Sequence, residues 1–352
     1  MAVYTTIDDP SAHFQTDIFT TPGGASSTTF DGNSDMQPDF VWAKQRNSGS
    51  NGHELWDSTR GVSSTLFCQA TEAEDTTSGR ISSFNSDGFS WGTGGNLNTA
   101  GNFVSWGWKA NGGTTSSFTE SGNNPGGTYQ ANTTAGFSVV TYTGTGGAGT
   151  VSHGLGAAPE RLIIKNRSAA DAWAVYYGDN TDYLVLNTTG ATQDSVDWWN
   201  DTSPTSTVFT VGTNHSVNAD GENYVAYVFA PIQGFSKFGS YVGNGSTTNG
   251  PFVYLGFKPA FVMIKSIDTA KNWVMLDDKR DGYNGGAQYL IANDTNAEGE
   301  TPSSGGHIDF LSNGFKIWDN WTLTNQSTVN YIYMAWAENP FVSSTGIPTT
   351  AR

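Results

Sequence analysis

Short apolar segments recur along this chain, and one kind of segment occurs three times. Each copy begins with Pro, continues as a mostly apolar run and ends with Lys, and the copies are residues 38–44, 159–165 and 259–265. A nearly unbroken apolar run predicts a central strand that is covered on both faces of its sheet. The chain therefore repeats one type of buried strand.

A second kind of segment follows each of these and alternates large with small residues; its copies are residues 102–108, 223–229 and 330–336. In the first copy Val104, Trp106 and Trp108 fall on one face and Ser105 and Gly107 on the other, as the period of two of a strand requires. The Lys of the first segment and the last aromatic residue of the second are 64, 64 and 71 residues apart. Two unlike patterns at this spacing predict three copies of one unit.

The remaining segments of each unit also predict strands. An aromatic-bounded strand opens each copy, at residues 14–19, 137–142 and 235–241, and a later strand begins near Phe89, Phe209 or Phe315. No long segment has a clean period of 3.6 residues. Short strands separated by turn residues are typical of antiparallel sandwiches. We therefore predict an all-β protein made of three tandem antiparallel β-sandwich units.

The predicted units are residues 1–110, 136–233 and 234–341. Residues 111–135 are rich in Gly, Ser, Thr and Asn and predict a linker or an extended arm. Almost nothing separates the second unit from the third, so we expect these two to pack as a fixed pair, with the first attached more loosely. The small polar tail, residues 342–352, is expected to become ordered only through contact with something else.

Composition supports the same fold class and excludes several partners. Of the 352 residues only 14% are charged, 43 are Gly, and the formal net charge is −16. This negative charge disfavours nucleic acid and anionic membranes, which bind through Lys and Arg. No apolar run reaches the roughly 18 residues of a membrane span, and the N-terminus has no secretory signal pattern. Cys68 is the only cysteine, so no intramolecular disulfide and no Cys-based metal site is expected.

Two loops combine aromatic with amide and carboxylate groups, which is the combination that carbohydrate sites use. They contain Trp198, Trp199, Asn200 and Asp201 in the second unit, and Trp318, Asp319, Asn320 and Trp321 in the third. A sugar ring stacks on an aromatic face while polar groups bind its hydroxyls. Burial in the core or against another subunit explains the same residues. Both interpretations stay open at this point.

Other polar groups are given structural interpretations. His153 stands alone beside a Gly turn and is interpreted as a turn hydrogen-bonding residue. The acidic residues 72–75 are expected to form a solvated loop and not a pair of glycosidase carboxylates. Residues 31–35 and 220–222 have Asp-Gly turn chemistry without the ligands of a calcium loop. We expect no catalytic residues, no metal and no cofactor.

Several sequence motifs resemble those of one family of proteins. His-Gly-Leu-Gly-Ala-Ala-Pro at residues 153–159, followed by Ile-Ile-Lys-Asn-Arg at 163–167, is similar to a phrase of phage tail-associated proteins. The stretches at 137–144, 243–246 and 335–341 resemble repetitive virion structural proteins of marine phages, including those of cyanobacteria. The likeness is strongest from about residue 136 to 340, and the first unit lacks the His-Gly-Leu-Gly phrase. The resemblance implies a virion component with lectin-like sandwich domains and supplies no catalytic residue.

The resulting hypothesis is a non-enzymatic structural protein on the surface of a phage particle. The first version is a tail fibre or adhesin-like subunit that engages host surface glycan and gains from multivalency. The alternative is a capsid decoration or head-fibre protein with purely protein–protein contacts, in which residues 1–12 and 342–352 are docking arms. Other virion proteins are the expected partners, in a homo-oligomer that is a trimer or a hexamer. A polysaccharide-degrading enzyme remains a remote alternative.

Overall fold

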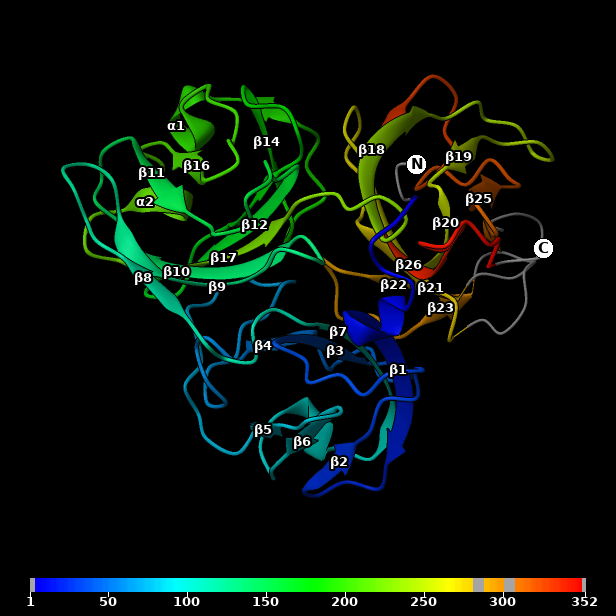
Figure 1. The fold of residues 1–352 in the computed structure, drawn as a ribbon, viewed down its shortest axis with the longest axis horizontal. Helices are drawn as coiled ribbons and strands as arrows, with labels where there is room; N and C mark the ends of the chain where they lie inside the picture. The colour runs from blue at the N-terminus through cyan, green and yellow to red at the C-terminus, as the bar shows by residue number, and fades with distance from the viewer. Residues whose placement is uncertain (1–3, 281–287, 301–307, 350–352) are drawn as a thin grey trace.

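Three lobes, one for each copy of the repeat, meet at a common centre in the computed structural model of the chain (Figure 1). The structure describes residues 4–280, 288–300 and 308–349. Within these residues the strands pair antiparallel in several sheets and the helices are short, which confirms the predicted all-β fold class. We refer to the lobes as unit 1 (β1 to β7), unit 2 (β8 to β17) and unit 3 (β18 to β26).

Unit 1 consists of a main sheet with the strand order β1-β7-β3-β4 and a small sheet with the order β2-β6-β5. Its opening strand therefore lies beside its closing strand, and the Pro-led strand β3 lies next to the closing strand. The elements are η1 (Pro10–Ala12), β1 (Phe14–Thr21), β2 (Ser26–Thr28), β3 (Phe40–Gln45), β4 (Glu54–Asp57), β5 (Ile81–Phe84), β6 (Phe89–Trp91), η2 (Asn96–Asn98) and β7 (Gly101–Trp108).

Unit 2 repeats the arrangement, with β10-β17-β12-β13 as the equivalent part of its main sheet and β11-β16 as its small sheet. Strands β8, β9, β14 and β15 extend the main sheet at its two edges. The elements are β8 (Ser116–Phe118), β9 (Gly126–Asn132), β10 (Phe137–Thr143), β11 (Gly149–Ser152), β12 (Arg161–Asn166), β13 (Trp173–Tyr176), β14 (Asp182–Val185), β15 (Gln193–Asp194), α1 (Val196–Trp199), β16 (Val208–Val211), α2 (His215–Asn218) and β17 (Asn223–Phe229).

Unit 3 has the main-sheet order β18-β26-β20-β21-β22-β23 and a small sheet β19-β25-β24. The first four strands of that order repeat the order of the other two units. The elements are β18 (Ser236–Val242), β19 (Phe252–Tyr254), β20 (Phe257–Ser266), β21 (Val274–Asp277), β22 (Gln288–Ile291), β23 (Gly299–Glu300), β24 (Ile308–Leu311), β25 (Gly314–Ile317) and β26 (Asn330–Pro340).

The structure corrects the expectation that residues 111–135 form a linker. Strand β9 pairs along its whole length with β10, and β8 pairs with β9, so this segment is an edge of the unit 2 sheet. Its glycines serve close packing: a Cβ atom on Gly127 would lie 2.0 Å from the carbonyl oxygen of Thr141. Composition indicated flexibility here, whereas the backbone pairing and the stacked rings of Phe118 and Tyr129 hold the segment in place.

The three main sheets share one core. Their inner faces contribute to a single buried cluster, whereas the outer faces of units 1 and 2 each pack on that unit's own small sheet. The last large residues of the three closing strands, Trp108, Phe229 and Trp336, meet at its centre. Their ring centroids are 5.2 to 6.3 Å apart. The predicted large-residue face of the closing strand thus faces the other units.

Each unit also donates a hydrogen bond to the unit before it, and these bonds close a ring. The indole of Trp173 in unit 2 donates to the Phe67 carbonyl of unit 1 (3.0 Å), and Trp273 in unit 3 donates to Val185 of unit 2 (3.1 Å). In unit 1 the equivalent position is His53, whose Nε2 donates to the carbonyl of Ile291 in unit 3 (2.9 Å). The units therefore contact one another head to tail.

The repeated lysines stand beside these ring-closing residues. Lys44, Lys165 and Lys265 are all buried, and their ammonium groups donate to backbone carbonyl oxygens. Lys165 and Lys265 each donate also to a carbonyl of the preceding unit, that of Thr71 or Thr189. Burial lowers the pKa of each lysine to about 8. The Lys at the end of the apolar run is therefore part of the contact between units.

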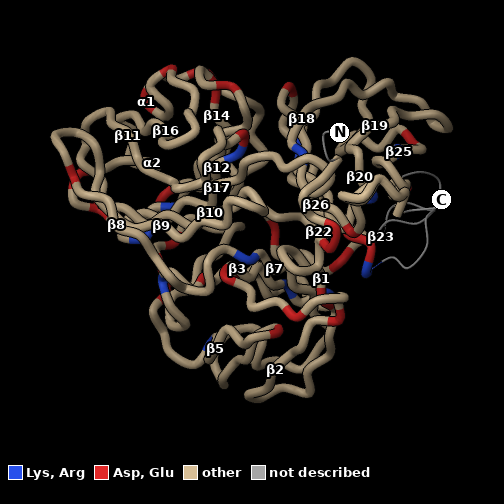
Figure 2. The backbone as a smooth tube through the Cα atoms, viewed as in Figure 1, with Lys and Arg blue, Asp and Glu red and all other residues tan. Residues whose placement is uncertain are grey.

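Ion networks join unit 1 to both of its neighbours, and they correct two expectations. Glu74 lies between Arg60 of its own unit and Arg167 of unit 2, with both contacts at 2.8 Å. Burial alone would raise its pKa, but the two guanidinium groups lower it to about 2. Glu298 of unit 3 likewise binds Arg46 of unit 1 (2.8 Å). The expected solvated loop at residues 72–75 is therefore wrong for Glu74 and Asp75, which form ion pairs, whereas Glu72 is exposed. The expectation that unit 1 is loosely attached is also wrong. Figure 2 shows charged positions where unit 1 meets the others.

The ring-closing His53 makes the fold sensitive to acid. Its Nδ1 accepts a hydrogen bond from the Trp42 indole (2.8 Å), and burial together with the Lys44 charge lowers its pKa to about 3. The stability that neutral His53 provides is complete above its unfolded pKa of about 6.5 and is lost as the pH falls toward 3. We expect the free energy of unfolding to fall by up to about 1.4 kcal/mol per pH unit more steeply in the native chain than in His53→Gln. Urea titrations at pH 7, 6, 5 and 4 measure this difference, and parallel pH profiles would contradict it.

The two ends of the described chain contact each other. The backbone N–H of Ser344 donates to the carboxylate of Asp8 (2.6 Å), and Thr349 donates from its backbone to Phe341 (3.3 Å). Residues 342–349 are therefore held against the N-terminal segment of the same chain. Residues 1–3 and 350–352 of the expected docking arms lie outside the described residues.

Candidate functional site

The aromatic loop of unit 2 lies mostly inside the protein. Trp198 and Trp199 end the short helix α1 and are only 5% and 1% exposed. The Trp198 ring stacks on Tyr183 at 3.8 Å, and the Trp199 indole donates to the carbonyl of Asp182 (3.1 Å). Asn200 and Asp201 follow in the left-handed conformation and are exposed. Only these two polar side chains of the loop reach the surface, and the rings stabilise the core of unit 2.

The second candidate loop, in unit 3, is different, because its first ring is exposed. Trp318 is 40% exposed, whereas Asp319 is buried and accepts a hydrogen bond from the backbone N–H of Trp321 (2.8 Å). Trp321 is half-buried and packs on Tyr289 at 4.8 Å. Asn320 is exposed. The loop therefore presents one indole and one amide to solvent.

Trp318 belongs to a larger polar and aromatic surface on the small sheet of unit 3. The exposed face of this sheet carries Phe252 and Tyr254 from β19, Lys316 and Trp318 from β25 and the loop that follows it, and Asp309 from β24. We call these five residues the Trp318 face. The strand period of two places these residues on one face of the small sheet, since Val253, Phe315 and Ile317 point to the opposite face and are buried.

Polar contacts fix the orientation of the exposed ring. The Trp318 indole N–H donates to Asp309 Oδ2 at 2.6 Å, and the ammonium group of Lys316 lies 5.3 Å from the ring centroid. Lys316 in turn donates to Asn249 Oδ1 at 2.7 Å. A ring held at its edge in this way keeps a face free for stacking, with a carboxylate, an ammonium group and an amide beside it.

The fold does not require a side chain at position 318. Counted from the buried phenylalanine of the equivalent strand, this position is Gly92 in unit 1 and Gly212 in unit 2. A Cβ atom at these glycines would lie 2.6 Å from the carbonyl oxygen of Gly79 and 2.2 Å from that of Asp197, so neither unit has room for a side chain there. In unit 3 the position carries an exposed Trp.

The sequence pointed to Trp318 and Asn320 but missed the rest of the Trp318 face. Phe252, Tyr254 and Lys316 each alternate with buried residues along a strand, a pattern that was available. Asp309 comes from a separate strand, and only the sheet register, which pairs it with Lys316, brings it to the indole. A signal for that pairing is absent from the local sequence.

The other polar candidates have structural roles in the described residues. His153 is buried; its Nδ1 accepts a hydrogen bond from the backbone N–H of Leu155 (3.2 Å), as the turn interpretation predicts. Asp31 forms an exposed ion pair with Lys279 (2.8 Å). Across residues 4–280, 288–300 and 308–349, no group of three or more His, Cys, Asp or Glu side chains is placed to hold a metal ion. None of the helices in this part of the chain is long and apolar enough to cross a membrane.

Comparison with known proteins gives one match. The model of a family described as a domain of unknown function (DUF7483) matches residues 9–340, which include all three units. The chain belongs to this family. No curated protein and no solved structure matches the chain. The DUF7483 region includes the whole Trp318 face and the three junctions between units.

Proposed function

We propose that this chain is a non-enzymatic surface protein of a phage particle, a tail fibre or adhesin-like subunit that binds host surface glycan through the Trp318 face. One observation carries the binding site: unit 3 exposes an oriented indole at a position where units 1 and 2 have a glycine under a backbone carbonyl. Exposed aromatic surface of this kind marks interaction sites. The virion location is supported by the sequence resemblance alone.

The chemistry of the Trp318 face suits a sugar. An aromatic ring binds the apolar face of a pyranose, while Lys316 of this face and the neighbouring, exposed Asn320 are donors and acceptors for its hydroxyl groups. Phe252 and Tyr254, 46% and 49% exposed, extend the surface along β19. A glycan of several residues therefore finds more than one aromatic contact. Affinity at one such site is modest, and the trimer or hexamer that we propose multiplies it.

Binding to the purified surface polysaccharide of the host tests this proposal. Trp318→Ala is expected to weaken binding about tenfold, which corresponds to about 1.4 kcal/mol. Val196→Ala is the control, because Val196 is 50% exposed on unit 2, away from this face. Surface-immobilised polysaccharide and a concentration series of each variant give the affinities. Equal binding by Trp318→Ala and the native chain would refute the assignment of the site.

The alternative function, capsid decoration through protein–protein contacts, is favoured by the same exposed Phe252 and Tyr254 on an edge strand. A decoration protein would bind no host polysaccharide and would saturate particles at an integer ratio to capsid subunits. Labelling purified particles with an antibody against this chain separates the two, since label at the tail supports the adhesin and label over the head supports decoration. Release of reducing ends from the polysaccharide would instead show the enzyme alternative.

A further inference from the structure

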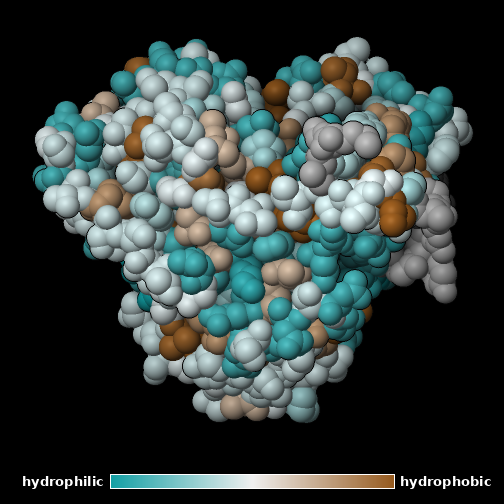
Figure 3. Space-filling view, in the orientation of Figure 1, coloured by the Kyte–Doolittle hydropathy of each residue, from teal (hydrophilic) through white to brown (hydrophobic). Residues whose placement is uncertain are grey.

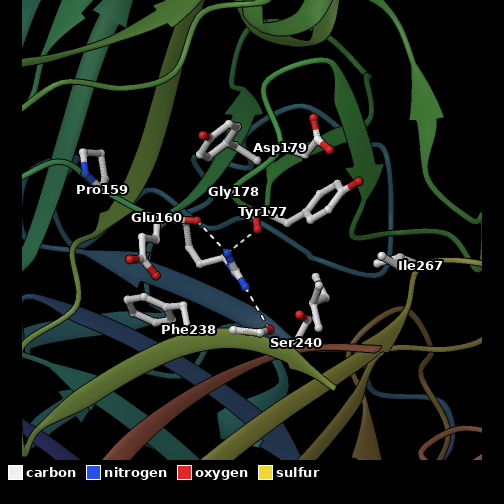
Figure 4. A pocket seen from close by; sticks show the side chains of 12 residues that line it. Pro159, Glu160, Tyr177, Gly178, Asp179, Phe238, Ser240 and Ile267 are labelled. Atoms are coloured by element: carbon white, nitrogen blue, oxygen red, sulfur yellow. Dashed lines mark hydrogen bonds between the residues drawn. The ribbon is translucent and has the colours of Figure 1, made fainter. Parts of the chain in front are cut away.

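A pocket of about 420 Å³ opens between units 2 and 3. Figure 3 shows the outline of the molecule hollowed between these two lobes. In Figure 4, Tyr177, Gly178 and Asp179 of unit 2 lie on one side of the pocket, and Phe238 and Ser240 of unit 3 lie on the other. The volume is within the range of small-molecule sites. The pocket therefore has room for a small ligand with contacts to both units.

An arginine occupies a core position at this junction. Arg161 lines the pocket, is 3% exposed and stands two residues after the repeated proline, where unit 1 has Phe40 and unit 3 has Phe261. Phe40 stacks on Tyr227 of the neighbouring unit at 4.1 Å, so an aromatic ring at this position packs well in the shared core. Burial lowers the pKa of Arg161 to about 10, because the charge has lost much of its water. A buried charge at this position is costly unless it is hydrogen-bonded and paired with an opposite charge.

The partners of Arg161 in the described residues are neutral. Its guanidinium donates to the carbonyl oxygens of Glu160 (2.8 Å), Tyr177, Gly239 (3.3 Å) and Tyr333 (3.4 Å). Its Nε–H is buried and has no hydrogen-bond partner. The ring of Phe238 lies 5.8 Å from the guanidinium carbon. In the part of the chain that the structure describes, no carboxylate forms an ion pair with this arginine.

The other two junctions contain carboxylates where this one does not. Asp57 and Asp277 stand opposite the sister phenylalanines across the hairpin, and each pairs with a buried arginine. At the same place unit 2 has Tyr177. The other two junctions also contain a second carboxylate, Glu74 or Glu298. Its counterpart in unit 2 is Thr192, because the backbone N–H of each of these three residues donates a hydrogen bond to the next unit. The junction between units 2 and 3 thus lacks both anions. Asn180 stands where the other two junctions have the paired arginine, so the buried arginine of this junction, Arg161, comes from a different position.

We propose that this pocket binds a carboxylate-bearing sugar, of the uronic acid type, whose carboxylate supplies the missing anion at Arg161. Tyr176, Tyr177 and Phe238 provide aromatic walls for a pyranose ring, and Ser240 provides a hydroxyl group. Glu160 and Asp179 also line the pocket. Their carboxylates accept hydrogen bonds from sugar hydroxyls and repel a second negative charge, so the ligand is a monoanion and not a phosphate or a polyanion.

This site is distinct from the Trp318 face and does not depend on the proposed function. The Trp318 face lies on the small sheet of unit 3, whereas the pocket residues come from the main sheets of two units and the loops beside them. Failure of either proposal therefore leaves the other standing, and one variant at each site tells them apart.

Titration of the full chain with D-glucuronate, followed by ligand-observed NMR, tests the inference. D-glucose is the matched ligand, because it has a hydroxymethyl group where the probe has its carboxylate and is otherwise the same sugar. We expect glucuronate to bind at least about tenfold more tightly than glucose, since a charge-assisted hydrogen bond to a desolvated guanidinium is strong. Arg161→Phe is expected to abolish this preference, and Trp318→Ala is expected to leave it unchanged.

Arg161→Phe introduces the residue that both sister units carry, so it is the variant most compatible with the core. Ser240→Trp provides a second test, because it places a large side chain at the exposed mouth of the pocket and leaves Arg161 unsubstituted. It is also expected to abolish binding. The proposal is overturned by any of three results: no saturable binding of glucuronate to the native chain, equal binding of glucose, or unchanged binding to a folded Arg161→Phe or Ser240→Trp variant.

Discussion

Replacing Trp108 with alanine is expected to lower the free energy of unfolding of the whole chain by about 3–5 kcal/mol, the usual range for a fully buried tryptophan. Its ring contacts Phe14 and Phe40 of unit 1, Phe229 of unit 2 and Trp336 of unit 3, with centroids 5.0 to 6.3 Å apart. The cavity left behind opens at the point where three sheets meet, and no single unit is able to close it.

Urea denaturation followed by circular dichroism measures this effect. Trp318→Ala is the matched control, because it removes the same side chain from the surface and is expected to change stability by less than about 1 kcal/mol. A shared core also predicts that Trp108→Ala shifts one cooperative transition and does not release unit 1 alone. A separate early transition for one unit, with the rest of the curve unmoved, would be evidence against the shared core.

The second large effect is expected from Asp57→Ala, which breaks a buried ion pair. Both side chains of the Asp57–Arg60 pair are fully buried, and Asp57 also accepts hydrogen bonds from the Arg60 backbone N–H (2.8 Å) and the Tyr227 hydroxyl (2.9 Å). Removal of the carboxylate leaves a buried guanidinium with Glu74 as its remaining carboxylate partner. We expect a loss of about 3–5 kcal/mol in the free energy of unfolding.

The exposed pair Asp31–Lys279 provides the control for this change. Its side chains are 64% and 37% exposed, so Asp31→Ala is expected to cost less than about 1 kcal/mol. The same denaturation experiment compares both variants at pH 7. If Asp57→Ala and Asp31→Ala lower stability equally, the buried network between units 1 and 2 contributes little to the stability of the chain.

The strands and the repeat were predictable because a period of two is a local property. Val104, Trp106 and Trp108 mark one face of a strand whatever covers that face. What covers it is not local, and the expectation of a loosely attached first unit was wrong for this reason. The alternation shows that Trp108 is buried on some surface, but only the packing of three main sheets shows that this surface belongs to the other units.

The site residues were likewise predictable only where their signal is local in the sequence. Trp198 and Trp318 look alike in sequence, yet the first is stacked on Tyr183 inside unit 2 and the second is exposed. The pocket at Arg161 was missed, although an alignment of the three copies contains its signal: Arg stands where the other two have Phe. The absence of the two carboxylates at that junction becomes meaningful only when the hydrogen bonds between units identify which residues are equivalent.

The head-to-tail ring has a further consequence, for behaviour at low concentration. Three separate subunits joined by the same contacts would dissociate on dilution, whereas the three units of one chain stay at a fixed effective concentration. Covalent linkage also frees each junction to diverge, because a substitution such as Phe to Arg changes one contact and not three. A ligand at the junction between units 2 and 3 therefore binds with a stoichiometry of one per chain, and the other two junctions maintain the ring.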